Sequence, residues 1–136
     1  MQLPITLGTA AVLGILFVAL GALTTVQRVQ AQTGLGLDAQ GPDGAPSPLL
    51  IANRRHGHFA EYVPISLILI GLLEAWGVGR NMLLGLAGAL ILARLLLAFG
   101  INAKTPNPWR LSGNILQWGL ILTASGAGLF RVFFAR

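Results

Sequence analysis

Four long apolar segments dominate this chain and restrict what it can fold into. Their expected bounds are residues 4–27, 53–76, 80–101 and 111–134. A helix that crosses the hydrocarbon core of a bilayer needs about 20 mainly apolar residues, at a rise of about 1.5 Å per residue. Each segment is long enough, so the sequence predicts an all-α integral membrane protein, with the whole chain as a single domain built around a four-helix bundle.

The composition supports this fold class and excludes several others. Hydrophobic residues make up 54% of the chain and charged residues only 10%, against about 25% charged in soluble domains. The apolar segments are continuous rather than alternating, which disfavours a membrane β-barrel. The first segment lacks a basic start and exceeds the apolar length of a signal peptide, so we expect it to be a retained span. Without cysteine, the chain offers neither a disulfide nor a thiolate nucleophile or metal ligand.

The connections between the segments predict how the helices follow one another. Residues 28–52 form the one long loop, rich in Gly, Pro, Asp and Ser, and the next link, WGVGRN, is short. Two prolines interrupt the third link, NAKTPNPWRLSGN. Short links of this kind join antiparallel neighbours, so we expect an up-down-up-down bundle.

The basic residues predict an orientation in the membrane. The first and third links carry five of them, against three on the other side: Arg28, Arg54, Arg55, Lys104 and Arg110, against Arg80, Arg131 and Arg136. The excess favours first and third links that are cytoplasmic. The net charge of +5 is scattered over helix ends, a pattern that suits an anionic lipid or ligand better than nucleic acid.

The start of the second segment, RRHGHFAEYVP, concentrates the polar chemistry of the chain. On a helix, Arg54, His58 and Glu61 fall on one face at i, i+4 and i+7, whereas His56 points nearly the opposite way. A guanidinium and a carboxylate on one face suit the carboxylate and ammonium of an amino-acid or peptide ligand. The alternative is a polar network that only tethers the helix. Two histidines at i, i+2 without a third ligand do not predict a metal site.

One arginine lies deep inside an apolar segment. Arg94 is about two-thirds of the way along the third segment, where burying an ionised group in lipid has a high free-energy cost unless the group faces protein. We expect it to face the bundle and to pair with Glu61, the acid on the same predicted side. Glu74, beside Trp76 and Arg80, is expected near the opposite membrane interface.

Small residues and tryptophans give weaker predictions. Gly85, Ala89 and Ala93 recur every four residues and predict a face where another helix backbone approaches closely, although small residues are also simply common in membrane helices. The three tryptophans fit interfacial anchoring or helix packing: Trp76, Trp109 and Trp118.

The RRHGHFAEYVP stretch resembles the second-helix motif of the MAPEG family, the membrane-associated proteins in eicosanoid and glutathione metabolism. The matching residues are Arg54, His56, Glu61, Tyr62 and Pro64. His58 stands where the family motif has asparagine. A second block, LARLLLAFG and then WRLSGN, is similar to the third helix and its exit in small bacterial members, through Arg94, Gly100, Trp109, Arg110, Ser112 and Gly113.

The resemblance implies a fold, a ligand and a set of site residues. It implies a homotrimer in a bacterial inner membrane, with glutathione as co-substrate between adjacent subunits near the cytoplasmic face. Arg54, His58, Glu61 and Tyr62 would hold the tripeptide, joined by Arg28. The candidates for stabilising the thiolate are Arg94 and Arg110, since the thiolate is the reactive form of a thiol. A lipophilic small molecule would react from the bilayer, in a transferase or peroxidase reaction.

Departures from the family pattern keep a second reading open. The third-helix tyrosines of the leukotriene-synthase branch appear here as Leu97 and Ile101, so specificity for fatty epoxides is not implied. The alternative is a non-catalytic MAPEG-like membrane protein with a structural or small-molecule-binding role, in which Arg94 and Glu61 are structural partners. A transporter is disfavoured because the sequence shows no inverted repeat.

Overall fold

The computed structural model describes residues 2–36, 44–102 and 106–134, and these ranges contain four long α-helices. They are α1 (Pro4–Gln30), α2 (Pro48–Ala75), α3 (Arg80–Gly100) and α4 (Pro108–Phe134). All four are long and apolar enough to cross a membrane. The prediction of an all-α protein with four membrane-length helices is therefore confirmed.

Two helices begin earlier than the sequence predicted, because polar caps precede their apolar residues. At the start of α2, the Oγ of Ser47 accepts a hydrogen bond from the amide of Leu50 at 3.1 Å, and Pro48 occupies the first helical position. At the start of α4, the side chain of Asn107 accepts from the amide of Trp109 at 3.0 Å. The added residues, 48–52 and 108–110, belong to stretches that the sequence analysis assigned to the connecting links, so the predicted helices began too late.

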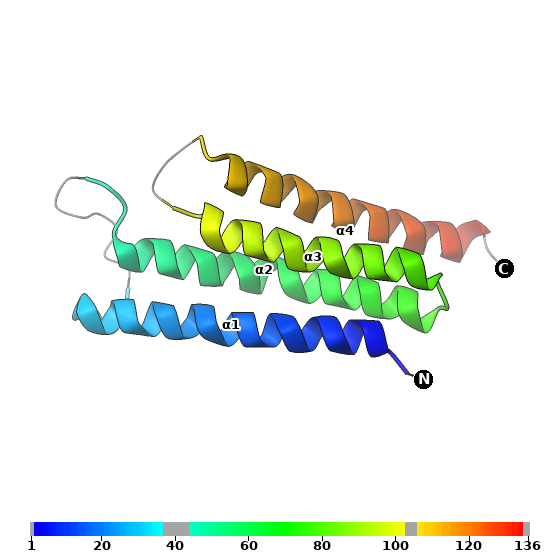
Figure 1. Cartoon of the computed structure of the whole chain (residues 1–136), viewed down its shortest axis with the longest axis horizontal. Helices are drawn as coiled ribbons and strands as arrows, with labels where there is room; N and C mark the ends of the chain where they lie inside the picture. Colours follow the sequence, from blue (N-terminus) through cyan, green and yellow to red (C-terminus); the bar gives the residue numbers. More distant parts are fainter. Residues whose placement is uncertain (1, 37–43, 103–105, 135–136) are drawn as a thin grey trace.

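The central helix of the bundle is α2, which packs against each of the other three. The closest pairs are α1 with α2 and α3 with α4, while α1 also touches α3. In Figure 1 the end of α1, the start of α2, the end of α3 and the start of α4 all lie at the left. The short turn from α2 to α3 lies at the right, where Gly77 has a φ of +79° that glycine adopts without strain.

The apolar side chains divide into a packed interior and an exposed outer face. Leu13, Ile70 and Leu90 are essentially inaccessible. By contrast, α1 and α4 present large apolar side chains outward, with Ile15 76% and Leu122 73% exposed. An exterior of this kind is suited to lipid rather than to water. All three tryptophans are also more than half exposed, which favours interfacial anchoring over packing inside the bundle.

The close approach of α3 and α4 depends on two glycines. A Cβ on Gly100 would stand 2.5 Å from the backbone nitrogen of Arg110, and one on Gly113 would stand 2.7 Å from Cγ of Leu97. The predicted small-residue face contributes less within this chain. Ala93 is fully buried, but a Cβ on Gly85 would meet nothing within 4 Å. The helices therefore meet most tightly at the exit of α3.

Glu74, near the end of α2, caps the start of α1. Its carboxylate accepts hydrogen bonds from the amides of Ile5 at 2.9 Å and Thr6 at 2.8 Å, and from the Thr6 hydroxyl at 2.6 Å. The first amides of a helix have no partner within the helix, and α1 has no side-chain cap of its own. The acid expected near the interface therefore joins two helices.

We expect Glu74→Gln to lower the melting temperature of the detergent-purified protein by an amount that corresponds to about 1–3 kcal/mol. The side-chain amide of the variant keeps one acceptor oxygen but has no negative charge. Its NH₂ group would face the N–H and O–H donors of Ile5 and Thr6, with which it cannot form hydrogen bonds. Glu61→Gln is the matched control on the same helix, because Glu61 is exposed and accepts no hydrogen bond from the described residues. Equal melting temperatures for the two variants would contradict this role for Glu74.

Candidate functional site

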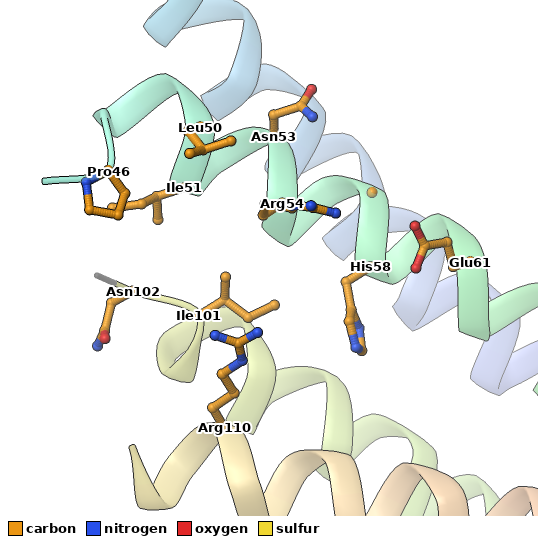
Figure 2. A pocket seen from close by; sticks show the side chains of 11 residues that line it. Pro46, Leu50, Ile51, Asn53, Arg54, His58, Glu61, Ile101, Asn102 and Arg110 are labelled. Atoms are coloured by element: carbon orange, nitrogen blue, oxygen red, sulfur yellow. The ribbon is translucent and has the colours of Figure 1, made fainter. Parts of the chain in front are cut away.

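An open pocket of about 430 Å³ lies where the start of α2 faces the end of α3 and the start of α4. Its size falls within the usual range for small-molecule sites. Figure 2 shows the side chains that line it. They are Pro46, Leu50, Ile51, Asn53, Arg54, Gly57, His58, Glu61, Ile101, Asn102 and Arg110.

The wall formed by α2 contains the three residues that the helical spacing placed together. Arg54, His58 and Glu61 all line the pocket, and in Figure 2 the imidazole of His58 points from α2 toward α3 and α4. His56 lies on another face, with its ring 4.6 Å from that of Phe17 in α1. Among the described residues, no group of three histidines or acids is arranged to hold a metal ion.

The facing wall comes from the junction of α3 and α4. Arg110 extends from α4 toward Ile101, as Figure 2 shows. The Nε of Arg55 donates to the carbonyl oxygen of Ile101 at 2.8 Å and ties this junction to α2. The side-chain Nδ2 of Asn107 donates to the carbonyl oxygen of Gly100 at 2.9 Å. Sequence reasoning assigned neither Arg55 nor Asn107 to the site, because each acts there through a backbone carbonyl that no motif marks.

Arg94 faces the bundle as predicted, but its predicted partner is wrong. Its side chain is 2% exposed. Nη1 contacts both Nδ1 and the carbonyl oxygen of His58 at 3.3 Å, and Nη2 donates to Oε1 of Gln117 at 2.5 Å. Within the described ranges no ion pair joins Arg94 to Glu61, which is exposed on the pocket side of α2. Neutral acceptors on α2 and α4 replace the expected carboxylate.

A chain of hydrogen bonds continues from Arg94 across the middle of the bundle. The Nε2 of Gln117 donates to the Oγ of Ser66 at 2.9 Å, and the Ser66 hydroxyl donates to the carbonyl oxygen of Tyr62 at 2.8 Å. Ser66 and Gln117 are both fully buried. Sequence reasoning missed these two residues. The available signal was a polar side chain within an apolar helix, which in a membrane usually faces protein.

Two other predicted site residues lie beside the pocket rather than in its wall. Tyr62 stacks on His58 with 4.6 Å between the ring centroids. Arg28 donates to the carbonyl oxygen of Gly36 at 3.0 Å and approaches Oδ1 of Asn53, a pocket residue, at 3.5 Å. Both therefore contact residues that line the pocket. Arg94 also contacts one such residue, His58.

The two positions that depart from the leukotriene-synthase pattern have different surroundings. Leu97 is buried against Gly113 at the α3–α4 contact, whereas Ile101 lines the pocket. An apolar Ile101 next to Arg110 leaves this wall with a cation but no hydroxyl. The pocket can therefore offer guanidinium groups, one carboxylate and one imidazole to a ligand of mixed charge.

Comparison with known proteins identifies the family of the chain. The model of the MAPEG family matches residues 6–130, nearly the whole chain. No curated protein and no solved structure matches the chain. A family match of this extent, over all four helices and both walls of the pocket, establishes that the chain belongs to the MAPEG family.

Proposed function

We propose that this protein binds glutathione in the pocket between α2 and α4 and uses it as co-substrate. The reaction is the transfer of its glutathionyl group to a lipophilic electrophile, or the reduction of a lipophilic peroxide to an alcohol and water. In the second case two glutathione molecules supply the two electrons and become the disulfide. Membership of the family suggests a membrane function related to glutathione. The observation that carries the proposal is the grouping of Arg54, Glu61 and Arg110 around one pocket.

The charges of the pocket complement those of the tripeptide. Glutathione carries an ammonium and two carboxylates, and charge-assisted hydrogen bonds to such groups are the strong ones. In the proposed complex Glu61 accepts from the ammonium, and Arg54 pairs with a carboxylate. Leu50, Ile51 and Ile101 line the same pocket with apolar surface, which lowers the local dielectric and strengthens these contacts.

Arg110 is the residue proposed to stabilise the thiolate. In the transferase reaction the sulfur forms a bond to the electrophilic carbon, and the leaving group departs with the electron pair. A guanidinium is a positively charged donor group, so it stabilises the ionised sulfur electrostatically. An apolar electrophile reaches this end of the bundle from the bilayer, along the exposed apolar faces of the helices.

The assembly is part of the same proposal. In this proposal the four helices cross a bacterial inner membrane alternately, and the first and third links lie with the pocket on the cytoplasmic side, as the excess of basic residues in those links favours. Three copies form a homotrimer in which an adjacent subunit closes the open side of each pocket.

A non-catalytic role is the second candidate, and the contacts of Arg94 favour it. Arg94 does not line the pocket, and its hydrogen bonds join α2, α3 and α4 as a structural tie would. In that case the pocket binds a small molecule without activating it. Ligand binding alone does not separate the two candidates, whereas turnover and its dependence on Arg110 do.

The role of Glu61 is tested by removing either partner of the proposed contact. Wild-type protein should bind glutathione about ten times more tightly than N-acetylglutathione, which lacks the ammonium. In Glu61→Gln this preference should disappear, whereas Glu74→Gln, at the other end of α2, should keep it. Calorimetric titration of the three purified proteins measures the ratio. A preference that survives in Glu61→Gln would show that the ammonium binds elsewhere.

A further inference from the structure

A second cavity lies between α1 and α3, away from the glutathione pocket. Its volume is about 760 Å³, against about 430 Å³ for the pocket. A Cβ on Gly8 or on Gly88 would meet nothing within 4 Å, so no side chain of the described residues fills the space beside these two glycines. Apolar residues make up most of the lining, and we call the cavity the α1–α3 groove. Its walls include Ile5, Gly8 and Val12 on α1 and Leu84, Gly88 and Ile91 on α3.

The α1–α3 groove faces the opposite side of the bundle from the glutathione pocket. Within the described helices, every pair is in contact except α1 with α4. The cross-section is therefore a rhombus, in which the α1–α3 edge lies opposite the α2–α4 edge. An adjacent subunit that closes the pocket between α2 and α4 leaves the α1–α3 edge facing lipid. Lipid is thus the molecule that meets the groove in the membrane.

One end of the α1–α3 groove carries a positive charge that is free to bind a ligand. Arg80, the first residue of α3, lines the groove and is exposed. No hydrogen bond or ion pair engages it within the described ranges. Glu74 lines the same end, but its carboxylate accepts hydrogen bonds from the amides of Ile5 and Thr6, and the positive end of the α1 dipole offsets its charge. A cation beside an apolar surface complements an amphiphile with an anionic head.

The length of the α1–α3 groove matches one leaflet of a bilayer. Along α3 the lining runs from Arg80 to Ile91, which is about 16 Å at a rise of about 1.5 Å per residue. Half of a hydrocarbon core of about 30 Å has nearly the same thickness. Trp76, 56% exposed shortly before Arg80, marks this end as the membrane interface. A lipid with its head at Arg80 therefore has its chain alongside the groove as far as the middle of the bilayer.

We propose that the α1–α3 groove binds one acyl chain of an anionic phospholipid, whose phosphate pairs with Arg80. The chain fills a space that no described side chain occupies, and it gains van der Waals contacts with both helices. The guanidinium binds the phosphate through charge-assisted hydrogen bonds. The site is at the other end of the bundle from the glutathione pocket, and it does not depend on the proposed function.

The headgroup contact is tested by the choice between two lipids with identical acyl chains. The purified protein is equilibrated in mixed micelles with equal amounts of phosphatidylglycerol, which is anionic, and phosphatidylcholine, which is zwitterionic. Native mass spectrometry then measures the lipid that each protein retains. Wild type should retain about five times more phosphatidylglycerol, the effect of about one basic residue near an anionic lipid, and Arg80→Gln should retain both equally. Arg131→Gln, in the last turn of α4 at the same end of the bundle but outside the groove, should keep the preference.

The acyl-chain contact is tested by filling the groove. In Gly88→Leu the new side chain extends into free space, so the protein should fold and lose most of its bound lipid, whichever headgroup the lipid has. Gly85→Leu is the matched control on α3. A Cβ there also meets nothing within 4 Å, but Gly85 does not line the groove, so this variant should retain lipid as wild type does.

Several results would overturn the lipid site. Equal retention of the two lipids by wild type, or a preference that survives in Arg80→Gln, would show that Arg80 does not bind the headgroup. Equal retention by Gly88→Leu and Gly85→Leu would place the chain outside the groove. A wild-type protein that retains neither lipid would have no such site. Glutathione binding is measured separately, so each of these results leaves the proposed function standing.

Discussion

Gly100→Ala is expected to destabilise the protein by about 3 kcal/mol, near the upper end of what overpacking costs. The added Cβ would lie 2.5 Å from the backbone nitrogen of Arg110 and 2.8 Å from the carbonyl carbon of Trp109. Both neighbours are backbone atoms, so no side chain can move aside. Relief requires α4 to move away from α3, which would also displace Arg110 from the pocket. Ligand binding should therefore fall together with the melting temperature.

The control for Gly100→Ala lies on the same helix. A Cβ on Gly88 would meet nothing within 4 Å, so Gly88→Ala should leave stability unchanged or raise it by up to about 1 kcal/mol through helix propensity. Thermal unfolding in one detergent compares the two variants. Equal melting temperatures for Gly100→Ala and Gly88→Ala would show that α3 and α4 are less closely packed at Gly100 than in this structure.

The largest effect on activity is expected at Arg110. Arg110→Ala should lower the rate of glutathione conjugation to an aromatic chloride by about 10²–10³-fold, the usual loss when one charge-stabilising donor is removed. Arg110→Lys keeps the charge but not the planar fork of donors, and should lose about tenfold. The rate of product formation by detergent-purified protein, at saturating glutathione, measures both effects.

The control for Arg110 is an arginine at the other end of the bundle. Arg80 begins α3, and Arg80→Ala should leave the conjugation rate unchanged. If Arg110→Lys retained the full conjugation rate, Arg110 would act at the membrane surface and not at the sulfur. Absence of turnover in wild type that still binds glutathione would favour the non-catalytic candidate.

The helices were predictable because hydropathy and length report directly on a membrane span. The face shared by Arg54, His58 and Glu61 was predictable too, since it follows from helical periodicity on a single element. Helix starts were less predictable, as the caps at Ser47 and Asn107 precede the apolar residues.

Contacts between helices could not be read from the sequence in the same way. Arg94 was assigned an acid because charge pairing is the simplest compensation, but relative rotation of α2, α3 and α4 instead places the neutral acceptors of His58 and Gln117 beside it. Glu74 gave no sign of capping α1, because its partners are backbone amides far away in the sequence. The pattern of residue types predicts neither the rotation of one helix against another nor which backbone groups a side chain will bind.

The most direct test of the account is calorimetric titration of the detergent-purified wild-type protein with glutathione. A pocket that offers Arg54, Glu61 and Arg110 to a ligand of mixed charge predicts saturable binding, with one glutathione for each chain. No saturable heat at any accessible glutathione concentration would contradict the central claim, and the pocket would then serve another ligand.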